Sequence, residues 1–219
     1  MYTVKDVCDA LFELAPADEK MDIDNVGLLA GDSLRKVDSI LGSLDITSEV
    51  IKEAVDTGVD LIVSHHPLLF SEKSITDTTL TGKLILSLLS NKISAICMHT
   101  NLDAARGGVN DALARACGLS GVQILCDEGH YSDGTAYSYG RIGRLDPEVP
   151  LRDYLSMLKS ALKTKGLRYH NSGKAVSKVA VVGGSGGSYL ERAFGLGCDT
   201  LVTADVKYDV FLAAREIGI

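Results

Sequence analysis

SILGSLDITSEVIKEAVDTGVDLIVSHH, residues 39–66, has the pattern of a strand, a helix and a second strand. Residues 37–44 and 61–64 are short apolar runs, and the residues between them, 47–57, place apolar side chains at helical spacing. Thr47 suits the N-cap of that helix, because its hydroxyl can accept a backbone N–H of the first turn. Strand, helix and strand at this spacing predict a parallel crossover unit and an α/β sheet.

The same alternation continues on both sides of this stretch. The pattern predicts a helix that starts at residue 4 and stops at Pro16, further helices over residues 80–90, 109–117 and 151–163 and from residue 188, and a last helix to residue 217. It predicts strands over residues 93–98, 179–182 and 200–203. From Gly121 the composition shifts to Gly, Ser and Tyr, which indicates strands and turns. We therefore predict an N-terminal α/β domain over residues 1–125 and a second α/β domain over residues 126–219.

An internal similarity links the two predicted domains. Shifting the chain by 139 positions lays residues 39–66 over residues 178–205 without a gap. Ala54, Gly58, Asp60 and Val63 then coincide with Ala193, Gly197, Asp199 and Val202. Two crossover units of this kind could converge on such a pattern, so both a true repeat and convergence explain it.

Composition narrows the class of protein. The chain has 219 residues, 46% hydrophobic content and a formal net charge of −7, with no cluster of basic residues that would track a nucleic-acid backbone. No apolar stretch reaches the roughly 18 to 20 residues of a membrane span. The five cysteines are widely spaced, without a CxxC pair, which indicates reduced core residues. We expect a soluble, cytoplasmic protein.

Two adjacent histidines, His65 and His66, end the strand over residues 61–64 and are followed by Pro67. Side chains alternate along a regular strand, so the two rings can reach one cleft only where the strand stops. Such a pair can approach two different points, as two metal ions would require. On the dipeptide alone, a simpler interpretation is one hydrogen-bonded and one solvated histidine at a strand terminus.

A second segment favours the metal interpretation. His99, Thr100, Asn101 and Asp103 follow the next predicted strand, at the same edge of the sheet. Imidazole and carboxylate ligands suit Zn, Mn, Fe or Ni, whereas magnesium prefers oxygen alone. Asp103 could bridge two ions through its two oxygens.

Several motifs then resemble one known family, the GTP cyclohydrolase 1 type 2 homologues, also called Nif-three-like dinuclear metal-centre proteins. They are DNVGLLAGD, VSHHPLLF, HTNLDAARGGVNDALA, GRIGRL and TADVKYDVFLAAREIGI, in this order between residues 2 and 219. The resemblance implies two interleaved α/β domains with mixed sheets flanked by helices, and a toroidal homohexamer. It also implies two divalent metal ions per subunit, with His65, His66 and Asp103 as ligands. His99 corresponds to a neighbour of the site, for which we predict a catalytic role as proton shuttle or orienting group.

The family pattern continues past the last helix to a Gly-His segment and a Glu that supply further ligands, whereas this sequence ends at Ile219. We therefore expect this chain to retain at most one loosely held ion. The predicted function is a metal-dependent hydrolase acting on a small anionic or nucleotide substrate. The alternative is a metal-binding, ring-forming adaptor or regulatory protein. The glycine loop over residues 183–187 could bind a phosphate, or could simply connect a strand to a helix.

Overall fold

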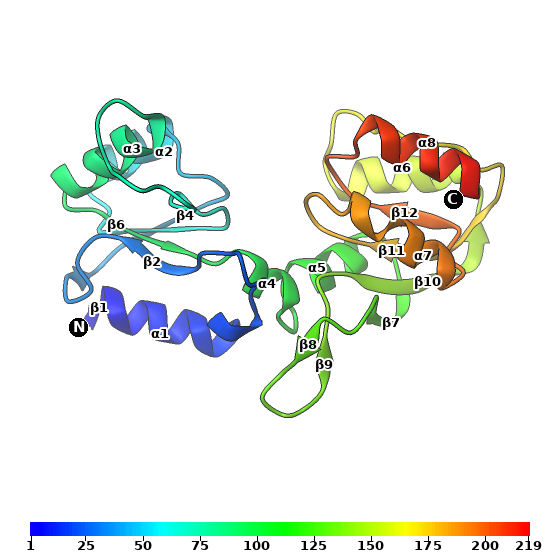
Figure 1. Cartoon of the computed structure of the whole chain (residues 1–219), viewed down its shortest axis with the longest axis horizontal. Helices are drawn as coiled ribbons and strands as arrows, with labels where there is room; N and C mark the ends of the chain where they lie inside the picture. Colours follow the sequence, from blue (N-terminus) through cyan, green and yellow to red (C-terminus); the bar gives the residue numbers. More distant parts are fainter. The chain divides into compact units, whose positions relative to one another are not determined.

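The computed structural model describes all residues, 1–219, and divides the chain into two compact units, Met1–Ala105 and Arg106–Ile219 (Figure 1). The fold is mixed α/β, as predicted, and each of the two units contains a mixed sheet flanked by helices. The boundary precedes the one predicted at residue 125. The reason is that helix α5 (Val109–Ala116) and strand β7 (Ser120–Ile124) pack with the core and the sheet of the second unit.

The first unit is built on a four-stranded sheet with the order β2-β6-β5-β4. Strands β4, β5 and β6 run parallel, and β2 is antiparallel to β6. The strands span Gly27–Ala30 (β2), Ile40–Ser43 (β4), Leu61–Ser64 (β5) and Ser94–Cys97 (β6). A two-stranded ribbon of β1 (Tyr2–Thr3) and β3 (Lys36–Val37) completes the strands of this unit.

Helices cover both faces of this sheet, with α1 on one side and α2 and α3 on the other (Figure 1). Leu61 packs with the α1 side and its neighbour Ile62 with the α2 and α3 side, and neither is exposed to solvent. Alternate residues of a central strand face opposite layers, which explains the continuous apolar run in β5. The helices span Val4–Leu14 (α1), Ser48–Thr57 (α2) and Leu80–Ser90 (α3), followed by the short helix Thr100–Ala104 (α4) and, earlier, the 3-10 turn Ala17–Glu19 (η1).

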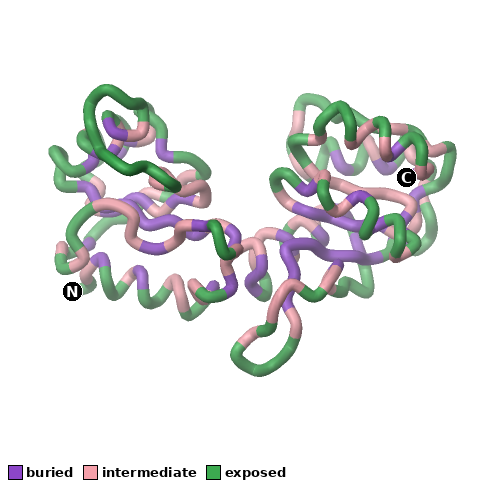
Figure 2. The backbone as a smooth tube through the Cα atoms, in the orientation of Figure 1, coloured by how far each residue is buried: buried purple, intermediate pink, exposed green.

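The second unit contains a four-stranded sheet with the order β12-β11-β10-β7, in which only β11 and β12 are parallel. Buried residues follow these strands through the unit (Figure 2). Helices α5 and α6 pack on one face, whereas α7 and α8 pack on the other. Bounds are Arg141–Val149 (β10), Leu151–Ala161 (α6), Val176–Val181 (β11), Gly187–Tyr189 (η2), Leu190–Gly195 (α7), Thr200–Val202 (β12) and Tyr208–Ile217 (α8), with the hairpin Gly129–His130 (β8) and Ala136–Tyr137 (β9).

The similarity at an offset of 139 residues is also present in the backbone. Ile40 pairs with Leu61 in parallel strands, and the equivalent residues Val179 and Thr200 pair in the same register. The Asp60 carboxylate accepts the backbone N–H groups of residues 38 and 39, and Asp199 accepts those of residues 177 and 178. Such detailed agreement supports an internal repeat.

The helix starts follow the expected capping chemistry. Thr47 accepts the backbone N–H of Val50 and caps α2, as the sequence predicted, and Thr3 forms a capping box with Asp6 at the start of α1. None of the helices combines the length and the hydrophobicity that crossing a membrane requires. All five cysteines are free thiols, and four of them are buried.

Candidate metal centre

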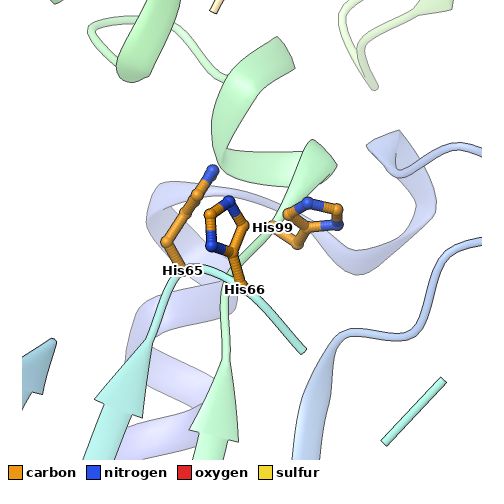
Figure 3. Close-up of side chains that lie close together, drawn as sticks. All are labelled: His65, His66 and His99. Atoms are coloured by element: carbon orange, nitrogen blue, oxygen red, sulfur yellow. The ribbon is translucent and has the colours of Figure 1, made fainter. Parts of the chain in front are cut away.

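Three imidazoles gather at the carboxyl ends of two neighbouring parallel strands, β5 and β6 (Figure 3). His65 and His66 follow β5, and His99 follows β6. The ring centroids of His65 and His66 lie 5.1 Å apart, those of His65 and His99 5.2 Å, and those of His66 and His99 5.7 Å. One ring nitrogen of each histidine lies within 4.8 Å of the others. The structure therefore brings together the three histidines that the sequence singled out.

Backbone contacts hold the adjacent histidines in place. The His65 and His66 N–H groups donate to the carbonyl oxygens of Ser43 and Leu44, at 3.2 and 2.9 Å, so pairing with the neighbouring chain segment continues past β5. The His65 carbonyl accepts the Cys97 thiol at 3.0 Å, and the His66 carbonyl accepts the Ser64 hydroxyl at 2.9 Å. With the backbone fixed in this way, the two rings lie beside each other with planes inclined at 51°.

In each of the three histidines, the Nδ1 atom lies within hydrogen-bond distance of an oxygen acceptor. His65 Nδ1 lies 2.9 Å from the Met98 carbonyl oxygen, His66 Nδ1 lies 2.7 Å from Asp45, and His99 Nδ1 lies 2.9 Å from Asp24. Because carbonyl and carboxylate oxygens accept, Nδ1 must carry the hydrogen. In a neutral ring this leaves a lone pair on Nε2, the arrangement typical of histidines that ligate metals.

Asp24 is a buried carboxylate whose side chain is 2% exposed. Besides the His99 ring it binds the backbone N–H of Thr100 at 3.0 Å, the Thr100 hydroxyl and the N–H of Asn25 at 2.7 Å. Burial alone would raise the pKa of Asp24, but the hydrogen bonds from Thr100, His99 and Asn25 outweigh it and lower this pKa. Asp24 is therefore an ionised, fixed partner for His99.

Asp103 lies on α4 with an oxygen 3.8 Å from His65 Nε2. Burial raises the pKa of the Asp103 carboxyl, and the neighbouring imidazoles oppose that change. Burial lowers the pKa of His65, so its ring is neutral at neutral pH and can donate a lone pair. Helix α4 is anchored by Asn101, a fully buried residue whose side-chain amide donates to the Ala15 carbonyl at 2.7 Å.

The donor set fits a transition-metal ion. Three imidazole nitrogens and one carboxylate are ligands that Zn, Mn, Fe and Ni accept. Around a tetrahedral ion, ligand atoms lie about 3.4 Å from one another if each is about 2.1 Å from the metal. The three ring nitrogens lie within 4.8 Å of each other, so they would have to move closer together to surround one ion.

Sequence reasoning selected His65, His66, His99 and Asp103 but missed Asp24 and Asp45. Both residues lie in or next to sequence features that can be recognised, a motif and the end of a strand. Asp24 is the first residue of the DNVGLLAGD motif, and Asp45 comes soon after the strand over residues 40–43. Residues at the carboxyl ends of parallel strands are where an α/β sheet places its site, so the same rule applied to β4 would have identified Asp45.

The glycine loop over residues 183–187 belongs to the second unit and is tied down by side chains. The Gly183 N–H donates to Asn110 Oδ1 at 2.8 Å, and the Gly186 N–H donates to the Thr203 hydroxyl at 2.8 Å. Two of the backbone donors that a phosphate would use are thus engaged within the protein. The structure gives this loop a clear role in joining β11 to η2.

A mixed α/β fold with converging imidazoles at the ends of parallel strands defines the chain as an α/β protein with a candidate metal centre. The chain belongs to the Duf34/NIF3 (NGG1p interacting factor 3) family, whose model matches residues 2–219. It is 37% identical over 218 residues to a GTP cyclohydrolase 1 type 2 homolog of Clostridium perfringens, covering 99% of this chain and 82% of the relative. The homolog of Clostridium acetobutylicum is 36% identical, with 99% and 81% covered.

Solved structures agree with this assignment. The Staphylococcus aureus hypothetical protein SA1388 superimposes with a TM-score of 0.90 at 30% identity, covering 99% of this chain and 83% of that one. A Bacillus cereus protein related to NIF3 gives a TM-score of 0.92 at 25% identity, covering 100% and 86%. HcgD of Methanocaldococcus jannaschii, in its reduced form, gives 0.80 at 28% identity, covering 99% and 84%. The predicted family and fold class are confirmed.

Proposed function

We propose that this protein binds divalent transition-metal ions through His65, His66 and Asp103 and acts as a metal-dependent hydrolase. The observation that carries the proposal is the convergence of three imidazoles with the largely buried carboxylate of Asp103, which lies 3.8 Å from His65 Nε2. Relatives named GTP cyclohydrolase 1 type 2 homolog support a hydrolytic reaction. The candidate ions are Zn, Mn, Fe and Ni, with two per subunit in a complete site of the kind that the family resemblance implies.

A bound divalent cation would supply Lewis-acid activation of water or of a carbonyl or phosphoryl oxygen. The chain itself holds the ligands in place through the Nδ1 contacts to Met98 and Asp45. The proton-handling role predicted for His99 requires that its Nε2 stay free to accept a proton, while Asp24 fixes the other nitrogen.

The proposed substrate is a small anionic molecule or a nucleotide. The chain carries a formal net charge of −7, so an anion needs a local positive centre, which the bound metal would supply. We also propose a cytoplasmic homo-oligomer, with the toroidal hexamer as the expected form. The family resemblance supports this assembly.

A non-catalytic role as a metal-binding adaptor or regulatory protein is the second candidate. The family description, NGG1p interacting factor 3, names an interaction and not a reaction, which favours this alternative. In that case metal binding would stabilise a surface that a partner recognises.

An activity screen separates the two functions. The protein is stripped with a chelator, reloaded with each of the four metals, and assayed with GTP and with p-nitrophenyl phosphoesters. The enzyme proposal predicts turnover that a chelator and Asp103→Ala both abolish. The control is Asp56→Ala, which removes an exposed carboxylate paired with Lys52 on α2. Metal binding without turnover of any of these compounds contradicts the hydrolase proposal and supports the adaptor.

A further inference from the structure

Strand β12 (Thr200–Val202) lies at one edge of the second unit's sheet, where it pairs only with β11. Each of its residues is partly exposed, whereas the residues of β11 that pair with them, Val179, Ala180 and Val181, are all buried. The backbone N–H and C=O groups on the outer side of such a strand can pair with a further strand. β12 is therefore an open edge made of half-exposed residues.

The internal repeat shows what the second sheet lacks beside this edge. At the offset of 139 residues, β12 corresponds to Leu61–Val63 of β5. Strand β5 has a parallel neighbour on each side, β4 and β6. For β12, the counterpart of β4 is β11, but no strand takes the place of β6. The second sheet thus lacks one parallel neighbour that the first sheet has.

A groove lies along the open side of β12. It is lined by every residue of β12 and by residues of α6 and α8, the helices that pack on opposite faces of the sheet. Tyr154 and Leu158 line it from α6, and Val210 and Phe211 line it from α8. Because both helical layers and the edge strand border one groove, the groove continues the plane of the sheet. Such a space fits a strand.

The rim of the groove is cationic. Arg168, His170 and Lys174 line it, all from the segment that joins α6 to β11. His170 and Lys174 contact backbone carbonyl oxygens of the two residues that follow α8, whereas Arg168 is exposed, with its Cζ atom 5.0 Å from the centre of the Phe211 ring. The acidic residue of the lining, Asp199, already accepts two backbone N–H groups. Arg168 is thus the cation best placed to meet an acidic group in the groove.

We propose that this groove binds one extended segment of a partner protein, which adds to the sheet as a parallel strand beside β12. In strand addition, backbone hydrogen bonds supply affinity and the covered side chains supply specificity. Both faces of the added strand are covered, so the segment needs a continuous run of small or apolar residues, as in β6, where Ser94–Cys97 are all buried. An acidic residue at the end of the run meets Arg168. The inference is independent of the metal centre, because the groove lies wholly within residues 151–219.

Binding of a defined peptide tests the inference. The probe is fluorescein-labelled ESAIVAE, a run that resembles β6 between two acidic residues, and its binding is followed by fluorescence anisotropy. We expect saturable binding of one peptide per chain. The peptide KSAIVAK should bind at least about 10-fold more weakly, because its charges oppose the cationic rim. The peptide ESPIPAE should not bind, because proline lacks the backbone N–H that a ladder needs.

A charge reversal at the rim tests the role of Arg168. Arg168→Glu should lower the affinity for ESAIVAE at least about 10-fold and raise the affinity for KSAIVAK. The matched control is Arg152→Glu, which changes an exposed arginine of α6 outside the groove and should leave both affinities nearly unchanged. Circular dichroism checks the folding of both variants. Equal effects of the two substitutions would contradict recognition at the rim.

Hydrogen exchange measured by mass spectrometry locates the bound peptide. Residues 200–203 should exchange at least about 10-fold more slowly with ESAIVAE bound, while β7, at the opposite edge of the same sheet, should be unaffected. Absence of saturable binding, equal binding of the proline peptide, or protection at β7 would overturn the inference. Strong protection of residues 200–203 in the free protein would overturn it as well, since a second copy or another segment of this chain would then fill the groove.

Discussion

The Nε2 atom of His65 lies 3.8 Å from a carboxylate oxygen of Asp103, although the two residues are 38 positions apart in the sequence. The contact forms because β5 and β6 are parallel neighbours, so the segments that follow them meet at one edge of the sheet. A largely buried carboxyl with a raised pKa next to a histidine with a lowered pKa is an unfavourable arrangement for the metal-free protein. A cation between them would reverse that balance.

Asp103→Asn should therefore stabilise the metal-free protein against heat and weaken the stabilisation that bound metal provides. Burial raises the pKa of Asp103, which means that its ionised form is disfavoured in the folded protein at neutral pH. Replacing it by the neutral amide should raise the melting temperature of the stripped protein and reduce the further rise caused by Zn²⁺. Calorimetry with and without Zn²⁺ measures both effects. A lower melting temperature in the stripped variant would show that Asp103 stabilises the fold itself.

Asp24→Asn should make stability depend less on pH. The folded-state pKa of Asp24 is lowered below the unfolded value of about 3.9. Its stabilising contribution is thus complete above that value and is lost as the pH falls through the folded-state pKa. The wild-type protein should exceed the variant in unfolding free energy at pH 6, and the difference should shrink below about pH 4. Urea unfolding across this pH range measures the difference in unfolding free energy. A difference that stays constant with pH would contradict a lowered pKa of Asp24.

The Cys97 thiol should resist alkylation in the native protein. Burial, together with the Asp24 carboxylate, raises the pKa of this thiol to about 12, and its hydrogen donates to the His65 carbonyl. The thiolate that reacts with iodoacetamide is therefore nearly absent at pH 8. Cys126, which is only partly buried, provides the comparison. Mass spectrometry of labelled peptides should show Cys126 modified before Cys97, with both modified in urea. Early labelling of Cys97 in the native protein would contradict its burial and its hydrogen bond to the His65 carbonyl.

Leu61→Ala should destabilise the sheet that supports the histidines. Leu61 is fully buried on β5 and packs in the core that α1 covers. Truncating such a leucine costs about 2–5 kcal/mol, depending on how far the core relaxes. Denaturant unfolding measures the loss, and the exposed Leu34→Ala, whose side chain is 73% exposed, is the control that should change little. Similar losses in both variants would contradict the core position of Leu61.

Much of this architecture could be predicted from local pattern. Strand β5 and helix α3 have the bounds that the apolar runs indicated, and Thr47 caps α2 as expected. These elements have strong local signals: a β-branched buried run, helical spacing and a capping hydroxyl. The repeat at an offset of 139 residues was also visible, because buried and turn positions recur at fixed places.

Other features depend on contacts between distant parts of the chain. Strand β2 was missed, since its four residues, GLLA, gain strand structure only by pairing with β6. The hydrogen bond of His99 to Asp24 joins residues 75 positions apart and has no local signature. The sequence could therefore supply the candidate ligands, whereas the acceptors that orient them required the structure.

Anomalous diffraction from crystals grown with Zn²⁺ tests the central claim most directly. The account predicts a zinc peak at the carboxyl ends of β5 and β6, about 2.0–2.1 Å from Nε2 of His65 and His66 and within ligand distance of Asp103. Data collected on either side of the zinc absorption edge identify the element. A fully occupied zinc position elsewhere, with no peak among these residues, would contradict it.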